Sequence, residues 1–173
     1  MMHRIMLVLV LATAPGLAQT GPTPANPAAR PAPRSIGTWY GWEAFTSQEA
    51  GTTVCYLVSR PFSAVPSMEG LGELALTVTR RPGREDTVAV AVGSADVSRA
   101  GAMLRIAAAS FPLDMGPDGA SVREAAAAVE VMKGGLQAVA NFERSQGARA
   151  TVTYSLRGFK AAYGTTRRVC PER

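Results

Sequence analysis

Large apolar residues stand at every second position in several short runs after residue 40, with small or polar residues between them. In one run Leu74, Leu76 and Val78 alternate with alanine and threonine. A period of two places successive side chains on opposite faces of a β-strand, so that one face is buried and the other meets solvent. The runs occupy residues 42–46, 54–59, 74–79, 88–92, 102–109, 136–142 and 152–156. We therefore expect strands along most of the chain.

Turn-forming residues separate these runs. Glycine is combined with proline, aspartate, serine or glutamine at residues 81–83, 93–94, 116–119 and 146–147. Such residues favour the backbone angles of tight turns, which join neighbouring antiparallel strands. Many short strands with turns at this spacing predict a mainly β fold, either an antiparallel β-sandwich or a barrel.

Two segments break the alternation and predict one or two short helices. Ser121 and Glu124 have the spacing of a capping box, in which each side chain caps a free N–H at the helix start. They precede an alanine run at residues 125–128, and glycines at 134–135 are expected to end this helix. In the second segment, residues 159–163 (FKAAY), apolar residues three and four positions apart share one face.

The N-terminus predicts a secretory signal peptide over residues 1–18. Arg4 supplies positive charge, residues 5–12 (IMLVLVLA) form an apolar run, and small residues at 16 and 18 precede a cleavage point before Gln19. We therefore expect export, most simply to a bacterial periplasm. His3 is the only histidine of the sequence and is removed with the signal.

The expected mature chain divides into two parts. Residues 19–36 hold five prolines among mostly small residues, a composition that favours extended conformations and cannot build a core. We expect a disordered spacer there, with a tether to a membrane or partner as the alternative. Residues 37–173 are expected to fold as a single β-rich domain.

The chain is basic, with 18 lysine and arginine residues against 13 acidic ones. An excess of arginine favours anionic partners such as phosphate-bearing lipids and polymers, although a plain solvated surface explains the same composition. We expect an unidentified envelope or protein partner, with an anionic one as the sharper possibility, and no nucleic acid. After the signal, no segment reaches the roughly 20 apolar residues of a transmembrane helix.

Several kinds of active site are excluded by the residues present. Without a histidine, the mature chain cannot form a Ser-His-Asp or Cys-His site. Two cysteines are too few for a typical zinc site, and the glycines at 70 and 72 do not make a dinucleotide fingerprint. We therefore expect no cofactor, no metal and no enzymatic activity.

Cys55 and Cys170 are the only cysteines. In an oxidising compartment an even number of cysteines predicts a disulfide, which would join the second strand to the C-terminal tail. The alternatives are a reactive thiol and a bond between two molecules. A reactive thiol is less favoured because no histidine and no CxxC partner is present to lower a thiol pKa.

Two groups of residues are candidates for a binding patch. Strand alternation places Trp42 with Tyr40 on one face and Trp39 with Phe45 on the other, with core packing as the alternative role. Three arginines near one turn have the chemistry to hold phosphate, with a solvated hairpin end as the alternative. The complete set is Trp39, Tyr40, Trp42, Phe45, Arg80, Arg81 and Arg84.

Four stretches of the sequence resemble the invasion-associated locus B family of alphaproteobacterial exported proteins. Residues 41–45 (GWEAF) are similar to the opening Gly-x-Trp strand of the family, and residues 55–61 (CYLVSRP) to its cysteine-containing strand. Residues 132–135 (MKGG) resemble a basic–glycine boundary before a strand. Residues 154–163 (YSLRGFKAAY), followed by Cys170, resemble the C-terminal block and are the most specific match.

The resemblance implies a small exported β protein and supplies no catalytic or cofactor residues. We therefore expect a periplasmic or cell-envelope binding or accessory protein whose molecular activity is unknown. The alternative is a carboxylate-dependent hydrolase acting on an envelope polymer, for which Glu43 and Glu73 are candidates. A purely structural envelope component is a third possibility.

Overall fold

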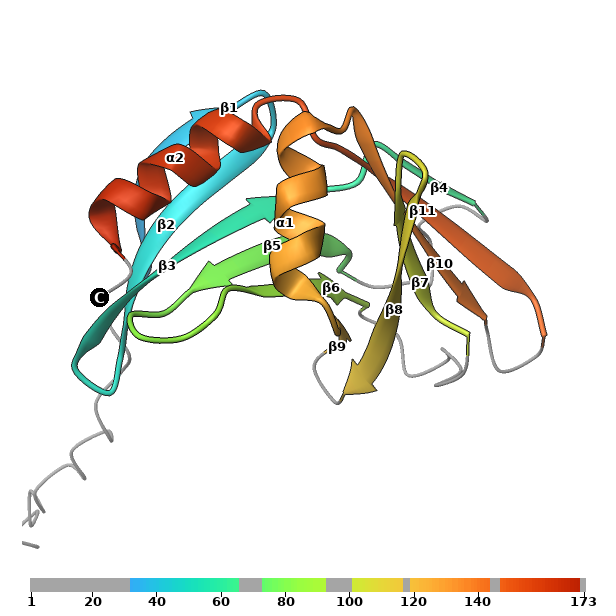
Figure 1. Ribbon diagram of the computed structural model, residues 1–173, viewed down its shortest axis with the longest axis horizontal. Helices are drawn as coiled ribbons and strands as arrows, with labels where there is room; N and C mark the ends of the chain where they lie inside the picture. The colour runs from blue at the N-terminus through green and yellow to red at the C-terminus, as the bar shows by residue number, and fades with distance from the viewer. Residues whose placement is uncertain (1–31, 66–72, 93–100, 117–118, 144–146, 172–173) are drawn as a thin grey trace, which may run out of the picture.

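The computed structural model describes residues 32–65, 73–92, 101–116, 119–143 and 147–171 (Figure 1). The strands are β1 (Arg34–Trp39), β2 (Trp42–Glu49), β3 (Thr52–Ser59), β4 (Ser63–Val65), β5 (Ala75–Arg80), β6 (Thr87–Ala91), β7 (Met103–Ile106), β8 (Ala109–Gly116), β9 (Gly119–Val122), β10 (Gln137–Glu143) and β11 (Arg149–Ser155). The helices are α1 (Ala125–Gly134) and α2 (Phe159–Val169).

All eleven strands belong to one sheet, in the order β1-β2-β3-β5-β6-β9-β8-β7-β10-β11-β4. The ladders along this order are antiparallel, which confirms the predicted mainly β fold with short helices. The sheet curls so that strands far apart in this order meet: Trp42 Nε1 of β2 donates a hydrogen bond of 2.9 Å to the carbonyl of Ser155 in β11. Among the described strands, β1 and β4 form the two edges and do not pair with each other, so the sheet is not a closed barrel.

Strand β8 connects the two halves of the sheet. Its first half, from Ala109 to Pro112, pairs with β7, and its second half, from Leu113 to Gly116, pairs with β9. Pro112 lies at the change of partner, where its missing N–H removes one possible ladder bond. One strand thus carries hydrogen bonding from the half of the sheet that contains β1, β2, β3, β5, β6 and β9 to the half that contains β7, β10, β11 and β4 (Figure 1).

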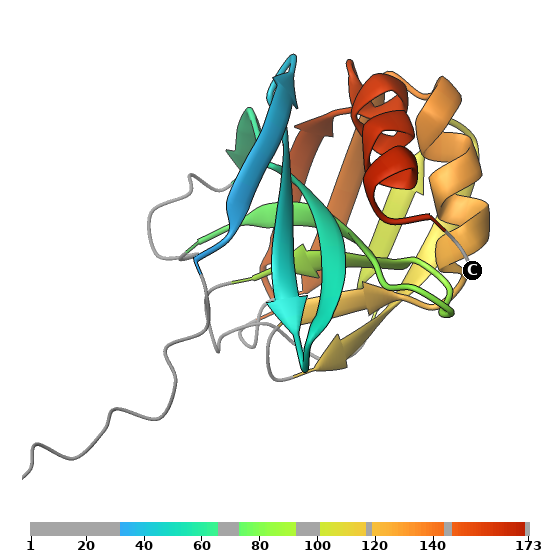
Figure 2. The ribbon, with the colours of Figure 1, turned by 90° about the vertical axis from the view of Figure 1, so that its left-hand side faces the viewer.

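The predicted alternation is confirmed in the core. Leu76 and Val78 of β5 are buried together with Val88 and Val90 of β6, and Leu104 belongs to the same core from the other half. The two helices lie side by side (Figure 2). Helix α2 contacts β1, β2 and β3, and α1 contacts β6 and β7, so the helices cover the same core.

The first helix begins later than the sequence predicts. Ser121 lies in β9, where its hydroxyl donates to the carbonyl of Asp114, so the expected capping box is wrong. Helix α1 starts at Ala125 after Glu124, which provides no side-chain cap. Four residues of β9 were too few for their alternation to be recognised. The end of α1 at Gly134 is confirmed.

Three further differences concern the ends of strands and helices. Residues 102–109, expected as one strand, contain β7 and then a turn at Ala107 with φ of +51° before β8 begins. Helix α2 begins at Phe159 as predicted but continues to Val169. Strand β1 begins at Arg34 and so includes the last three residues of the expected spacer.

Residues 1–31, which hold the expected signal peptide and most of the expected spacer, lie outside the described residues. No helix in the part of the chain that the structure describes combines the length and apolar character needed to cross a membrane.

Gly158 determines how α2 enters the fold. Its φ of +87° is in the left-handed region, which glycine adopts at little cost. A Cβ at this position would lie 2.5 Å from the carbonyl oxygen of Trp39, closer than non-bonded atoms approach. The glycine therefore allows the start of α2 to pack directly against the end of β1.

Candidate ligand-binding site

A buried polar network lies between β5, the start of β6 and α2. Arg80 Nη2 donates to Asp86 Oδ2 at 2.7 Å and to the hydroxyl of Tyr163 at 2.5 Å. The Tyr163 hydroxyl in turn donates to Asp86 Oδ2 at 2.5 Å. The side chains of Arg80 and Asp86 are only 3% and 7% exposed. Because each charge has the other within contact distance, the pair avoids the high cost of an isolated buried charge.

The sequence places these three residues together through simple local rules. Arg80 continues the inward alternation of Leu76 and Val78 along β5, so its side chain enters the core. The following turn, in which Arg84 N–H donates to the carbonyl of Arg81, returns the chain to β6 and places Asp86 beside it. Tyr163 comes from the buried face of α2. The network thus joins the sheet to the C-terminal helix.

A pocket of about 560 Å³ opens beside this network. It lies between the β5–β6 turn and the first turns of α1, with one contribution from α2. Its floor consists of buried side chains, those of Asp86, Val129 and Tyr163. Its rim consists of the exposed residues Gly83, Arg84, Glu85, Ala126, Ala127 and Glu130.

One hydrogen-bond acceptor of a residue that lines this pocket is unused, and it is shielded from solvent. Asp86 Oδ2 is occupied by Arg80 and Tyr163, but Asp86 Oδ1 is buried and has no hydrogen-bond partner among the described residues. A buried carboxylate oxygen without a donor is costly, because it has lost its water. The rim is mostly acidic or apolar: Glu85 is exposed, and Glu130 bonds Lys133 Nζ at 2.5 Å.

The three arginines predicted as a phosphate-binding cluster lie in different environments. Arg80 is buried in the polar network, and Arg81 forms a two-pronged ion pair with Glu49, at 2.8 and 3.1 Å. Only Arg84 is exposed, on the rim of the pocket. Asp86 was not predicted as a partner for Arg80. The alternation along β5 contained the necessary signal, because an inward-facing arginine requires a buried acidic partner.

The four aromatic residues predicted for the binding patch also differ in burial and in packing partners. Trp42 is fully buried, and its ring centre lies 4.9 Å from that of Phe159. Trp42 is therefore a core residue. Trp39 packs against the core from a partly buried position, and Phe45 stacks on Tyr56 at 5.3 Å.

Tyr40 takes a different position from the other aromatic residues. It is 70% exposed and lies under the guanidinium of Arg157, 4.7 Å from the ring centre. The expected sharing of faces, Trp42 with Tyr40, is wrong because Tyr40 and Gly41 form a turn with positive φ. That turn interrupts the alternation and pairs Trp39 with Trp42 across the hairpin.

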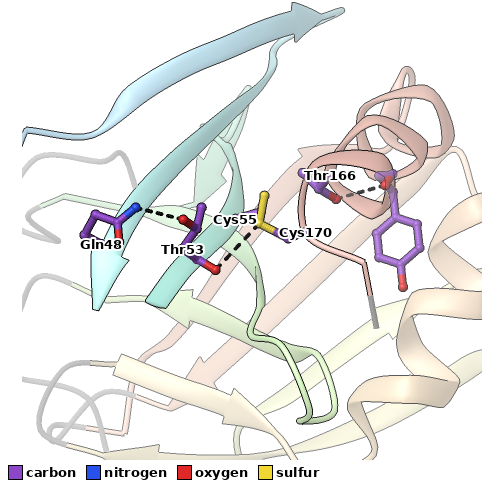
Figure 3. The surroundings of a disulfide bond; sticks show 6 residues. Gln48, Thr53, Cys55, Thr166 and Cys170 are labelled. Carbon is purple, nitrogen blue, oxygen red and sulfur yellow. Dashed lines mark hydrogen bonds between the residues drawn. A yellow bond between two sulfur atoms is a disulfide. The ribbon is translucent and has the colours of Figure 1, made fainter. Parts of the chain in front are cut away.

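The predicted disulfide between Cys55 of β3 and Cys170 is confirmed, with a Cα–Cα distance of 6.0 Å (Figure 3). Cys170 directly follows α2, and its N–H donates to the carbonyl of Thr166 at the last helical turn. The bond therefore attaches the end of α2 to the sheet. The sulfur of Cys170 also lies 3.9 Å from the carbonyl of Thr53.

The described residues contain no group of three or more histidine, cysteine, aspartate or glutamate side chains placed to hold a metal ion. The two carboxylates considered for hydrolysis are not in the pocket. Glu43 is partly buried in β2, and Glu73 is exposed before β5.

Comparison with known proteins identifies the fold. No family model matches the sequence, and no curated protein sequence matches it. The fold is similar to that of an invasion-associated protein. The crystal structure of invasion associated protein B from Bartonella henselae matches with a TM-score of 0.57 and 14% identity, over 77% of this chain and 95% of that one. At this identity the match establishes a shared fold and nothing finer.

Proposed function

We propose that this protein is an exported periplasmic or cell-envelope protein of the invasion-associated locus B type, and that it acts by binding a partner. The observation that carries the proposal is the fold match to Bartonella henselae invasion associated protein B, which covers 95% of that chain. The four sequence stretches that resemble the same family support it independently. The Cys55–Cys170 disulfide agrees with export, because such bonds persist in oxidising compartments.

A binding role fits the chemistry of the pocket better than catalysis does. Arg80, Asp86 and Tyr163 bond one another through Arg80 Nη2, Asp86 Oδ2 and the Tyr163 hydroxyl, and these bonds hold α2 against the sheet. The hydrolase alternative gains no support, since Glu43 lies in β2, Glu73 lies before β5, and neither lines the pocket.

Localisation is tested by expressing the full chain in a Gram-negative host. We expect the protein in the periplasmic fraction, beginning at or near Gln19, with the disulfide formed. The control Leu9→Arg interrupts the apolar run and should keep the protein in the cytoplasm with both thiols reduced. Intact Met1 on wild-type protein in the cytoplasm would contradict export.

Catalysis is tested separately with the exported protein and purified peptidoglycan. We expect no release of soluble fragments by the wild type, Glu43→Gln or Glu73→Gln. Fragment release that is lost in one of the two variants would favour the hydrolase.

A further inference from the structure

We propose that one end of the molecule binds the surface of a membrane that contains anionic phospholipids. This end consists of the β1–β2 turn, the β7–β8 turn, the α1–β10 connection and the β11–α2 loop, which lie toward the top of Figure 1. We call these residues, 39–41, 105–108, 133–137 and 156–160, the basic end. The inference rests on the proposed export, because an exported protein meets membrane surfaces in the cell envelope, and it names the partner.

Direct contacts join the segments of the basic end. The guanidinium of Arg157 lies over the ring of Tyr40, 4.7 Å from its centre. The N–H of Leu156 donates to the carbonyl of Leu136. Leu136 and Arg105 line the same pocket, a second one of about 610 Å³. The basic end is therefore one continuous surface built from four separate parts of the chain.

The basic end carries most of the excess positive charge. It holds Arg105, Lys133, Arg157 and Lys160, and no aspartate or glutamate. Lys133 is offset by its bond to Glu130 in the preceding turn of α1, whereas the other three form no ion pair among the described residues. The described residues include thirteen basic and nine acidic side chains, so three of the four excess charges lie at this end.

Neighbouring groups do not cancel this charge. Glu43 of β2 and Arg60, just after β3, lie beyond the β1–β2 turn and contribute one charge of each sign. The C-terminus of α1 and the N-terminus of α2 both lie at the basic end, so their dipoles offset each other. The side chains therefore set the sign of the potential, which attracts an anionic surface.

Exposed apolar side chains favour a membrane over a soluble anionic partner. Leu136 is 83% exposed and Tyr40 is 70% exposed, the two highest values among the large hydrophobic residues that the structure describes. Burying them requires an apolar partner, and a tyrosine ring with its hydroxyl fits the boundary between headgroups and acyl chains. Apolar burial combined with attraction to anionic headgroups is the physical basis of peripheral membrane binding.

The pocket beside Leu136 has the chemistry to hold a lipid headgroup. Arg105 is the one charged residue of its lining among the described residues, and Gln137 and Asn141 add side-chain amides. A guanidinium and amide N–H groups are suitable donors to the phosphate and hydroxyl oxygens of phosphatidylglycerol. The headgroup would be held here while Leu136 enters the apolar layer.

The test is sedimentation of the purified, disulfide-bonded exported protein with vesicles at about 0.15 M salt. The vesicles contain phosphatidylcholine alone or phosphatidylcholine mixed with phosphatidylglycerol. We expect at least tenfold tighter binding to the mixed vesicles, because each basic residue near an anionic surface strengthens binding about fivefold. Rising salt should weaken this binding. Equal binding to both kinds of vesicle, or no binding to the mixed ones, would overturn the inference.

Matched variants locate the binding surface. Arg105→Gln/Arg157→Gln should weaken binding to mixed vesicles at least tenfold. The control Arg84→Gln/Arg149→Gln removes two exposed arginines outside the basic end and should weaken binding no more than about threefold. Leu136→Ser should also weaken binding, whereas Val169→Ser, exposed at the far end of α2, should not. Equal losses in either pair of variants would contradict the assignment to the basic end.

Soluble anionic polymers test the competing kind of partner. We expect polyglutamate and purified peptidoglycan, at equal anionic charge, to displace the protein from mixed vesicles poorly. Displacement as effective as that by added phosphatidylglycerol vesicles would assign the basic end to an acidic polymer and overturn the membrane proposal. Localisation is measured in cells and vesicle binding with purified protein, so failure of one leaves the other unaffected.

Discussion

Two buried tyrosines mark two regions of the molecule that are stabilised in different ways. The hydroxyl of Tyr163 in α2 bonds both Arg80 and Asp86. The hydroxyl of Tyr154 in β11 is equally buried but has no partner among the described residues. The first tyrosine is held by directional bonds, and the second is held by the packing of its ring.

The same contrast extends to the surroundings of each residue. Helix α2 is fixed at its start by the close approach of Gly158 to Trp39 and at its end by the bond from Cys170 to Cys55. The β10–β11 hairpin has an uninterrupted seven-residue antiparallel register and an apolar inner face, and no disulfide links it to other elements. The region around α2 should therefore be sensitive to single changes that the hairpin tolerates.

The disulfide should have the largest effect. Replacing both cysteines by serine, or reducing the bond, removes a constraint on a loop of 115 residues. In the chain-entropy model this costs about 4–5 kcal/mol of unfolding free energy. The melting temperature should fall on the order of 10 °C or more, as measured by circular dichroism.

The Cys55→Ser/Cys170→Ser variant is also the control, because added reductant should leave its melting temperature unchanged. A wild-type melting temperature that does not respond to complete reduction would contradict the role of this bond in holding α2.

A matched pair of glycines tests how α2 enters the fold. Gly158→Ala introduces a Cβ at 2.5 Å from the Trp39 carbonyl at a positive φ, and should cost about 2–3 kcal/mol. Gly164→Ala lies inside the same helix, where the nearest atom is Arg168 Nη1 at 3.9 Å, and should stabilise by about 0.5–1 kcal/mol. Urea unfolding measures both changes. Equal changes in unfolding free energy for the two variants would show that the close approach of Gly158 to Trp39 does not constrain the residue at position 158.

The two tyrosines provide the most direct comparison. Tyr163→Phe removes the hydroxyl that bonds Asp86 and should cost about 1–3 kcal/mol, because buried charged groups lose a partner. Tyr154→Phe removes a hydroxyl without a partner in the described structure and should be neutral or stabilise by up to about 1 kcal/mol. A larger loss of unfolding free energy in Tyr154→Phe than in Tyr163→Phe would contradict the proposed difference between the two regions.

The smallest effect should appear at alkaline pH. Burial raises the pKa of the Tyr154 phenol above its ordinary value, so the folded state keeps this proton when the unfolded state loses it. The contribution to stability is complete below about pH 10 and is lost as the pH rises beyond that value. Tyr154→Phe should reduce the alkaline loss of stability, whereas the exposed control Tyr40→Phe should not.

The regular strands were predictable because each has enough residues for its alternation to be seen. The turn at Ala107 was not, because residues 107–109 are all alanine and no glycine or proline marks the change of direction. Strand β1 was hidden because Arg34 and Ser35 continue a proline-rich segment.

The candidate site could be predicted from the sequence less completely than the fold. The inward position of Arg80 follows from its spacing to Leu76 and Val78. Its partners come from a turn six residues later and from a helix 83 positions away, and no local pattern connects these segments. The pocket depends on the distance between α1 and the β5–β6 turn, which is set by tertiary packing.

The position of the disulfide also has a consequence for proteolysis. Cys55 and Cys170 close a covalent ring that contains every strand from β4 to β11 as well as both helices. A single cut of the backbone anywhere inside this ring leaves the two fragments joined through sulfur. A nicked molecule would keep both fragments, with one water added by hydrolysis, until the disulfide is reduced. Its two fragments would regain their native contacts as a single molecule, without a bimolecular encounter.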